Sequence, residues 1–180
     1  MRAVFLKGER IFLGPLSKKL DLKTYASWLN DPETTLYMGS GKFPSTVEGL
    51  KKYIDLYNNS RDGMLLGIFT IKNSRHIGNI SLHMIDWRSR NGEIGIVIGE
   101  KKAWGQGYST EAIKLVVWHA FNKLNLHKLY AGMIDGNEPS WRAFKSCGFK
   151  KEGLLEEHFY LNGKYLDCFR VGLLKKDFKC

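Results

Sequence analysis

The segment from Gly92 to Phe121, GEIGIVIGEKKAWGQGYSTEAIKLVVWHAF, most constrains the fold of this chain. It begins as an apolar strand, bends at Gly105 and Gly107, and continues with apolar residues at helical spacing. A strand that enters a helix through glycines directs unpaired main-chain N–H groups to one place, and the helix dipole adds partial positive charge there. The pattern therefore predicts an anion site, suited to a pyrophosphate, at the start of the helix.

The glycine pair has a second interpretation, a tight turn that binds no ligand. It does not match either of two well-known phosphate-binding motifs. A Walker loop requires GxxxxGK[ST], and a dinucleotide-binding fold requires GxGxxG early in a parallel βαβ unit. Here the glycines follow several strand-like runs, so these two classes are excluded.

The patterns on either side of the bend predict a mixed sheet with helices. The three runs before it suggest an antiparallel meander, with turn residues at Asn73-Ser74 and Asn91-Gly92. Ser45 and Glu48 form a capping-box pattern at the start of a helix. Strands are expected at 9–16, 64–72, 76–85, 92–100, 128–134 and 169–178, and helices at 22–30, 45–59, 112–124 and 139–147. In YLNGKYLD, Asn162-Gly163 is a strong signal for a hairpin turn. Strands followed by β–α–β–α–β predict an α/β (α+β) fold in one domain, residues 1–180.

Composition and charge narrow the classes of partner. The 180 residues are 43% apolar and contain neither a membrane-span pattern nor a signal-peptide pattern, so we expect a cytoplasmic protein without a membrane partner. Cys147, Cys168 and Cys180 are scattered and the histidines lack ligand spacing, so we expect no metal. The net charge of +10 suits a polyanion, either nucleic acid or a phosphate-rich cofactor, but also an ordinary solvated basic surface. Because no RNA-binding motif is present, we expect no specific nucleic acid.

Five segments carry a resemblance to a known superfamily: LKGERIFLGPL, WLNDPE, GEIGIVIGEKKAWGQGYSTEA, LNLHKLYAGMIDGNEPSWRAFKSCGFKKEG and EEHFYLNGKYLDCFRVGLLKKDF. In order and separation they resemble the GNAT superfamily of acetyl-CoA-dependent N-acetyltransferases, and within it the RimJ/RimL type, the ribosomal-protein N-terminal acetyltransferases. The resemblance implies a GNAT fold, with a mixed, mostly antiparallel sheet flanked by helices. It also implies that two central strands, IGIVIG and LYAGMI, splay apart.

The resemblance implies acetyl-CoA as cosubstrate and indicates where it binds. Main-chain amides from Trp104 to Thr110 would hold the pyrophosphate, and the splayed strands would expose their backbone to the pantetheine arm. The expected acetyl-CoA residues are Ile96, Val97, Ile98, Trp104, Gly105, Gln106, Gly107, Tyr108, Ser109, Thr110, Asn137, Ser140 and Phe144. Ser109 stands where the superfamily usually has Gly or Ala, and its hydroxyl can itself donate to phosphate.

Acetyl transfer requires an unprotonated amine, and the resemblance implies Glu93 as the general base. Alternatively, Glu93 is an ordinary strand residue paired with Arg88 or Arg90. The tyrosine that many members use as general acid is replaced by Phe144, which cannot donate a proton. The resemblance implies the Ser140 hydroxyl in its place, although a serine there also suits the start of a helix.

The acceptor amine is less constrained. A protein N-terminal α-amine and a small amine, such as an amino sugar, a polyamine or an antibiotic, are both open, as is a homodimer. LNLHKLY and FYLNGKY resemble spermidine acetyltransferases, but polyamine sites favour carboxylates and this chain has few acidic clusters. A non-catalytic acyl-CoA-binding or sensing module is the alternative function, because the usual tyrosine is absent.

Overall fold

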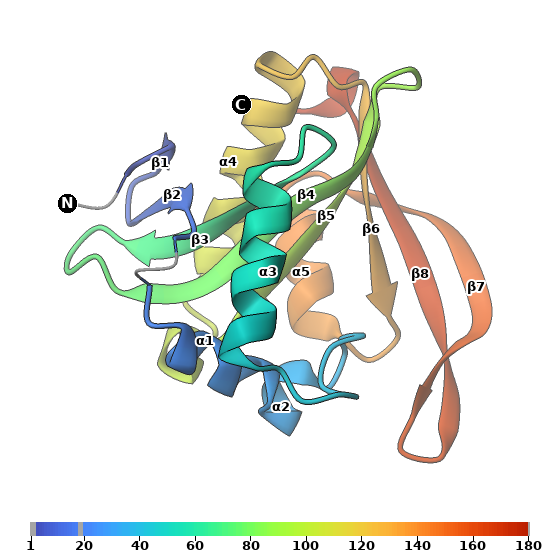
Figure 1. Ribbon diagram of the computed structural model, residues 1–180. Coiled ribbons are helices and arrows are strands. Elements are labelled where there is room, and N and C mark those ends of the chain that lie inside the picture. The colour runs from blue at the N-terminus through green and yellow to red at the C-terminus, as the bar shows by residue number, and fades with distance from the viewer. Residues whose placement is uncertain (1–2, 18–19, 180) are drawn as a thin grey trace.

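The computed structural model describes residues 3–17 and 20–179, which include eight strands in one sheet (Figure 1). The spatial order is β1-β2-β3-β4-β5-β6-β8-β7, and each pair of neighbours is antiparallel except β5 and β6. The strands are β1 (Leu6–Lys7), β2 (Ile11–Pro15), β3 (Met64–Thr70), β4 (His76–Asp86), β5 (Asn91–Ile98), β6 (Lys128–Ile134), β7 (Lys150–Leu161) and β8 (Lys164–Leu174). The expected mixed, mostly antiparallel sheet is confirmed.

Helices cover both faces of this sheet. They are α1 (Leu22–Leu29), α2 (Pro32–Thr35), α3 (Val47–Asn58), α4 (Tyr108–Asn122) and α5 (Glu138–Ser146), with short 3-10 turns η1 (Lys101–Ala103) and η2 (Lys175–Asp177). Figure 1 shows α3 in front of the sheet and α4 behind it. Apolar residues of α4 and α5 form one buried cluster with β2 to β6 and β8, and those of α1 and α3 form a smaller one with β2 and β3.

The central strands β5 and β6 separate along their length, as expected. They pair only from Asn91 to Glu93, against Lys128 to Tyr130. Beyond Glu93, β5 continues beside β4 alone, while β6 pairs with β8 over its whole length. Figure 1 shows the two strands close at their starts and diverging afterwards. The edge of β5 that faces β6 is therefore free of strand pairing from Ile94 to Ile98.

Three local predictions were wrong. The cap of α3 is Thr46, whose hydroxyl accepts from Gly49 N at 3.0 Å, because the main-chain N–H and carbonyl of Ser45 are both bonded to the Asn30 side chain, outside the helix. Asn91-Gly92 lies inside β5; the turn precedes it, where the Asp86 carboxylate accepts two main-chain N–H groups. The last strand begins at residue 164, earlier than expected, and pairs with β7 across the turn at Asn162-Gly163, as the hairpin signal predicted; the length of β7 was not predicted.

Candidate active site

The glycine bend has the geometry that its sequence predicts. Gly105 has φ +71° and Gly107 has φ +78°, in the left-handed region that favours glycine. Gly107 is the residue before the first turn of α4, and no described side chain caps that turn. The first intrahelical bond runs from Glu111 N to Gly107 O at 3.2 Å. The N–H groups from Gly107 to Thr110 thus have no partner within the helix and suit a phosphate.

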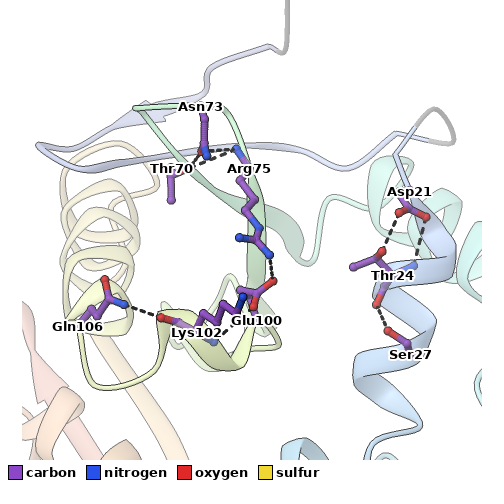
Figure 2. Close-up of polar contacts among 9 residues, drawn as sticks. All are labelled: Asp21, Thr24, Ser27, Thr70, Asn73, Arg75, Glu100, Lys102 and Gln106. Atoms are coloured by element: carbon purple, nitrogen blue, oxygen red, sulfur yellow. Dashed lines mark hydrogen bonds and ion pairs between the residues drawn. The ribbon is translucent and has the colours of Figure 1, made fainter.

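Contacts within the chain hold the bend from the side of β4 (Figure 2). Gln106 Nε2 donates to Lys102 O at 2.5 Å, and Glu100 Oε1 accepts from Lys102 N at 3.3 Å. Arg75, just before β4, pairs with the same Glu100 carboxylate. The Gln106 side-chain amide is therefore bonded within the loop, and its main-chain N–H is what remains for a ligand.

Arg10 holds the bend from the side of β2. Its Nη1 donates to Gln106 O at 2.8 Å, and its Nε pairs with Glu111 Oε2 at 3.1 Å. In a trans peptide the carbonyl and the following N–H point in opposite directions. Because Arg10 fixes the Gln106 carbonyl, the Gly107 N–H points away from Arg10. An arginine that was not predicted thus orients one of the proposed phosphate donors.

Trp104 has a different role from the amides that follow it. Its main-chain N–H donates to Lys101 O at 3.0 Å, and its indole Nε1 donates to Ile98 O at 2.6 Å. Trp104 therefore ties the bend to the end of β5. Ile96, Val97 and Ile98 pair with β4 and lie where β5 has no strand partner on its β6 side, and each residue is half-buried.

Asn137 and Ser140 lie together at the start of α5. Asn137 is the N-cap, and its Oδ1 accepts from Ser140 N at 3.4 Å. Ser140 is thus the third residue of the helix rather than its cap. Phe144, one turn later, is 2% exposed and packs edge-on against Phe149, with the two ring centroids 5.0 Å apart. Tyr37, which follows α2, lies close to Gly136, the residue before Asn137. A Cβ added at Gly136 would lie 3.2 Å from the Tyr37 hydroxyl oxygen.

Glu93 lies where β5 and β6 begin to separate. Its Oε1 accepts from Arg170 Nη1, on β8, at 3.0 Å, and its side chain is 17% exposed. Its partner is therefore Arg170 rather than Arg88 or Arg90. On β6, burial and the nearby Glu93 carboxylate raise the pKa of Tyr130, so this phenol stays protonated around neutral pH.

A cavity of about 420 Å³ lies on the α3 side of the sheet. It is walled by α1, α3, the segment from Met38 to Thr46, and strands β3, β4 and β5. Gly95, Ile96 and Val97 of β5 line it, so the strand assigned to acetyl-CoA also borders this space. Asn79 and Ser81 of β4 line it too, and neither was predicted. The signal was the alternation of Asn79, Ser81 and His83 among apolar residues, which marks one polar stripe of a strand.

Three further features of the described residues concern a membrane-spanning helix, a metal site and free thiols. Within 3–17 and 20–179, no helix combines the length and apolarity needed to cross a bilayer. The same ranges contain no group of three or more His, Cys, Asp or Glu side chains placed to hold a metal ion. Cys147 and Cys168 are buried free thiols, and Cys180 lies outside the described residues.

Comparisons with known proteins agree with this geometry. Residues 10–150 match the family model of the acetyltransferase (GNAT) domain. An uncharacterized N-acetyltransferase of Bacillus licheniformis, p20, is 30% identical over 94% of this chain and 96% of its own length. A spermidine N(1)-acetyltransferase of Vibrio cholerae is 25% identical over 96% of this chain and 91% of its own.

Among solved structures, spermidine N-acetyltransferase from Vibrio cholerae in complex with CoA and spermine has the same fold. Its TM-score is 0.84 at 24% identity, over 93% of this chain and 97% of that chain. The domain match covers the splayed strand, the glycine bend and the start of α5. These matches establish that the chain belongs to the GNAT family and is an acetyl-CoA-dependent N-acetyltransferase, and the uncapped first turn of α4 agrees with them.

Proposed function

We propose that this enzyme acetylates a primary amine that enters the cavity on the α3 side while acetyl-CoA lies along the other edge of β5. The observation that carries the proposal is the position of β5. Its residues Gly95, Ile96 and Val97 line the cavity, and its end leads into the glycine bend through η1. A thioester held by the bend and along the free edge of β5 would therefore lie beside an amine held in the cavity, which suits direct transfer within a ternary complex.

The proposed acetyl-CoA site combines three parts of the chain. The amides from Gly105 to Thr110 would hold the pyrophosphate, with the Ser109 hydroxyl as an additional donor. The edge of β5 at Ile96–Ile98, apart from the Ile98 carbonyl that the Trp104 indole engages, would bond the amides of the pantetheine arm, and Asn137 would contact the same arm from α5. Trp104 would support the bend through its indole rather than through its N–H, which Lys101 O already engages.

In the proposed chemistry, Glu93 removes a proton from the acceptor ammonium, directly or through water. The nitrogen lone pair then attacks the thioester carbonyl, a C–N bond forms and the C–S bond breaks. The departing CoA thiolate takes a proton from the Ser140 hydroxyl, which is the proposed donor, and the Ser140 oxygen regains a proton from the nitrogen, directly or through water, as the amide forms. A protein α-amine has a pKa near about 8 and an alkylamine near about 10.4, so the base matters most for alkylamines.

A panel assay tests the function. The enzyme is incubated with acetyl-CoA and, separately, a peptide α-amine, an amino sugar, spermidine or an aminoglycoside, while free thiol and acetylated product mass are followed. We expect thiol release matched by one acetylated amine. Tight CoA binding without product from any amine would instead support an acyl-CoA-binding module.

Glu93→Gln tests the base. We expect turnover to fall by about 100-fold, the lower range for loss of a general base, with the greatest loss at low pH, where more of the amine is protonated. The matched control is Glu152→Gln, which removes another ion-paired strand glutamate, bonded to Lys128 at 2.7 Å outside the cavity. An unchanged pH profile in the Glu93 variant would remove Glu93 from the proton path.

A further inference from the structure

The cavity floor carries a buried amide that the proposed chemistry does not use. Asn79, on β4, is 2% exposed and lines the cavity. Its Oδ1 lies 2.9 Å from His76 Nε2. Its Nδ2 has no hydrogen-bond partner among residues 3–17 and 20–179. Because burying an unsatisfied amide is costly, an unpartnered N–H group on a side chain that lines a cavity indicates a ligand atom that accepts a hydrogen bond.

The amide is held in position by a rigid aromatic surrounding. His76 packs against Trp28 and Phe69, with ring centroids 4.8 and 5.1 Å apart. With Oδ1 engaged by the imidazole, the Asn79 side chain cannot rotate to satisfy Nδ2 elsewhere without breaking that bond. Nδ2 is therefore a preorganised donor, which gives specificity at little entropic cost.

The rest of the cavity lining is uncharged. No Asp, Glu, Lys or Arg is among the described residues that line it. The other polar side chains carry hydroxyls, among them those of Ser81, Thr46 and Tyr53. Burial raises the pKa of Tyr25 to about 12, so this lining phenol also remains neutral. A polyamine carries several positive charges, and removing them from water requires carboxylate partners that this lining does not supply.

Resting on the proposed function, we infer that the acceptor is a primary amine whose remaining part is uncharged and presents a carbonyl or hydroxyl oxygen to Asn79 Nδ2. Asn79 is then a specificity-determining residue that selects such acceptors over polyamines. Two sources share this chemistry: the first peptide groups of a polypeptide N-terminus, and a hydroxylated small amine such as an amino sugar. The cavity of about 420 Å³ is within the range of small-molecule sites.

The test compares three acceptors: a neutral tripeptide amide with a free α-amine, glucosamine and spermidine. For each, kcat/KM is measured, and binding to the enzyme–CoA complex is measured by calorimetry. We expect one neutral acceptor to exceed spermidine by about tenfold or more in both measurements, and whichever it is identifies the source. Asn79→Leu should weaken that acceptor about tenfold, the effect of one lost hydrogen bond, with CoA affinity retained.

Asn79→Ser is the second variant, for the case that the leucine variant fails to fold. Its smaller side chain keeps a hydroxyl donor, so this variant should retain part of the preference for the neutral acceptor over spermidine. Asn122→Leu, an exposed asparagine on α4, is the matched control and should change neither constant. A preference for spermidine, or unchanged neutral-acceptor binding in a folded Asn79→Leu protein, would overturn the inference. Selective binding without thiol release from any amine would instead overturn the proposed function and leave the inference standing.

Discussion

At the scale of single residues, Gly107 has the most demanding backbone in the proposed pyrophosphate site. Its φ of +78° is in a region that side chains with a Cβ rarely adopt, and the nearest described atom to a Cβ added there is Arg10 Nη2, at 3.4 Å. The requirement for glycine is therefore one of backbone conformation more than of space. Any branched residue at this position would shift the peptide planes that aim the Gly107 and Tyr108 N–H groups.

Gly107→Val should weaken acetyl-CoA binding by at least about tenfold, because the strain of about 1–3 kcal/mol would be relieved by moving the bend. Gly163→Val is the control. Gly163 lies in the β7–β8 turn with φ +83° and has no described atom near its added Cβ. Calorimetric titration with CoA and thermal melts separate binding from stability. Equal losses of CoA affinity in the two variants would mean that the bend is not in the site.

At the scale of elements, sequence patterns predicted the features that depend on residues close together in sequence, and not those that depend on distant residues. The bend, the α4 helix and the β6 strand depend on neighbouring residues, and their patterns predicted them. The hairpin signal at Asn162-Gly163 marked the end of β7, but the rest of this strand, KKEGLLEEHFYL, was not predicted because it is an edge strand whose residues are largely exposed, so it lacks alternation. Thr46 rather than Ser45 caps α3 because Asn30, fifteen residues away, engages Ser45.

The residues of the proposed site also divide into those that the sequence marked and those that it did not. Glu93, Asn137 and the glycine-bend residues belong to segments whose patterns or resemblance marked them. Arg10 and Asn79 were not predicted, because the roles proposed for them arise from register and packing. Arg10 reaches Glu111, which is 101 positions away in sequence, and Asn79 matters only because α1 and α3 close over it. Single-sequence patterns contain no such long-range distances.

The contact between β2 and α4 gives a prediction at this scale. Arg10 and Glu111 form an ion pair that is partly exposed, and Arg10 also holds the Gln106 carbonyl. A double-mutant cycle with Arg10→Gln and Glu111→Gln should give a small coupling energy in stability, about 0.5–1 kcal/mol, because solvent screens the pair. Acetyl-CoA binding should weaken more clearly in Arg10→Gln, by about tenfold, since the Gly107 N–H loses its orientation.

Chemical denaturation and CoA titration measure the two effects. Lys128→Gln, which breaks an ion pair between β6 and β7, is the control and should leave CoA affinity unchanged. If Arg10→Gln binds CoA as tightly as the unmodified enzyme, the bend is held by its Gln106 and Trp104 contacts alone.

At the scale of the whole molecule, the sheet separates two buried clusters that correspond to the two proposed substrates. The larger cluster packs α4 and α5 against the sheet, on the side of the glycine bend. The smaller cluster packs α1 and α3 on the opposite face, where the cavity lies. Figure 1 shows these helices on the two sides of the strands. Binding of acetyl-CoA and binding of the acceptor should therefore depend on different parts of the core.

Two identical substitutions test this separation. Ile113, on α4, is 0% exposed, and Ile54, on α3, is 1% exposed, so Ile→Ala should cost about 2–5 kcal/mol of stability at each. Because α3 walls the cavity, Ile54→Ala should raise the acceptor KM with CoA affinity retained. Because α4 begins at the bend, Ile113→Ala should weaken CoA binding instead. Denaturation, titration and steady-state kinetics at low temperature measure these effects, and equal changes in both constants would mean that the two faces act as one unit.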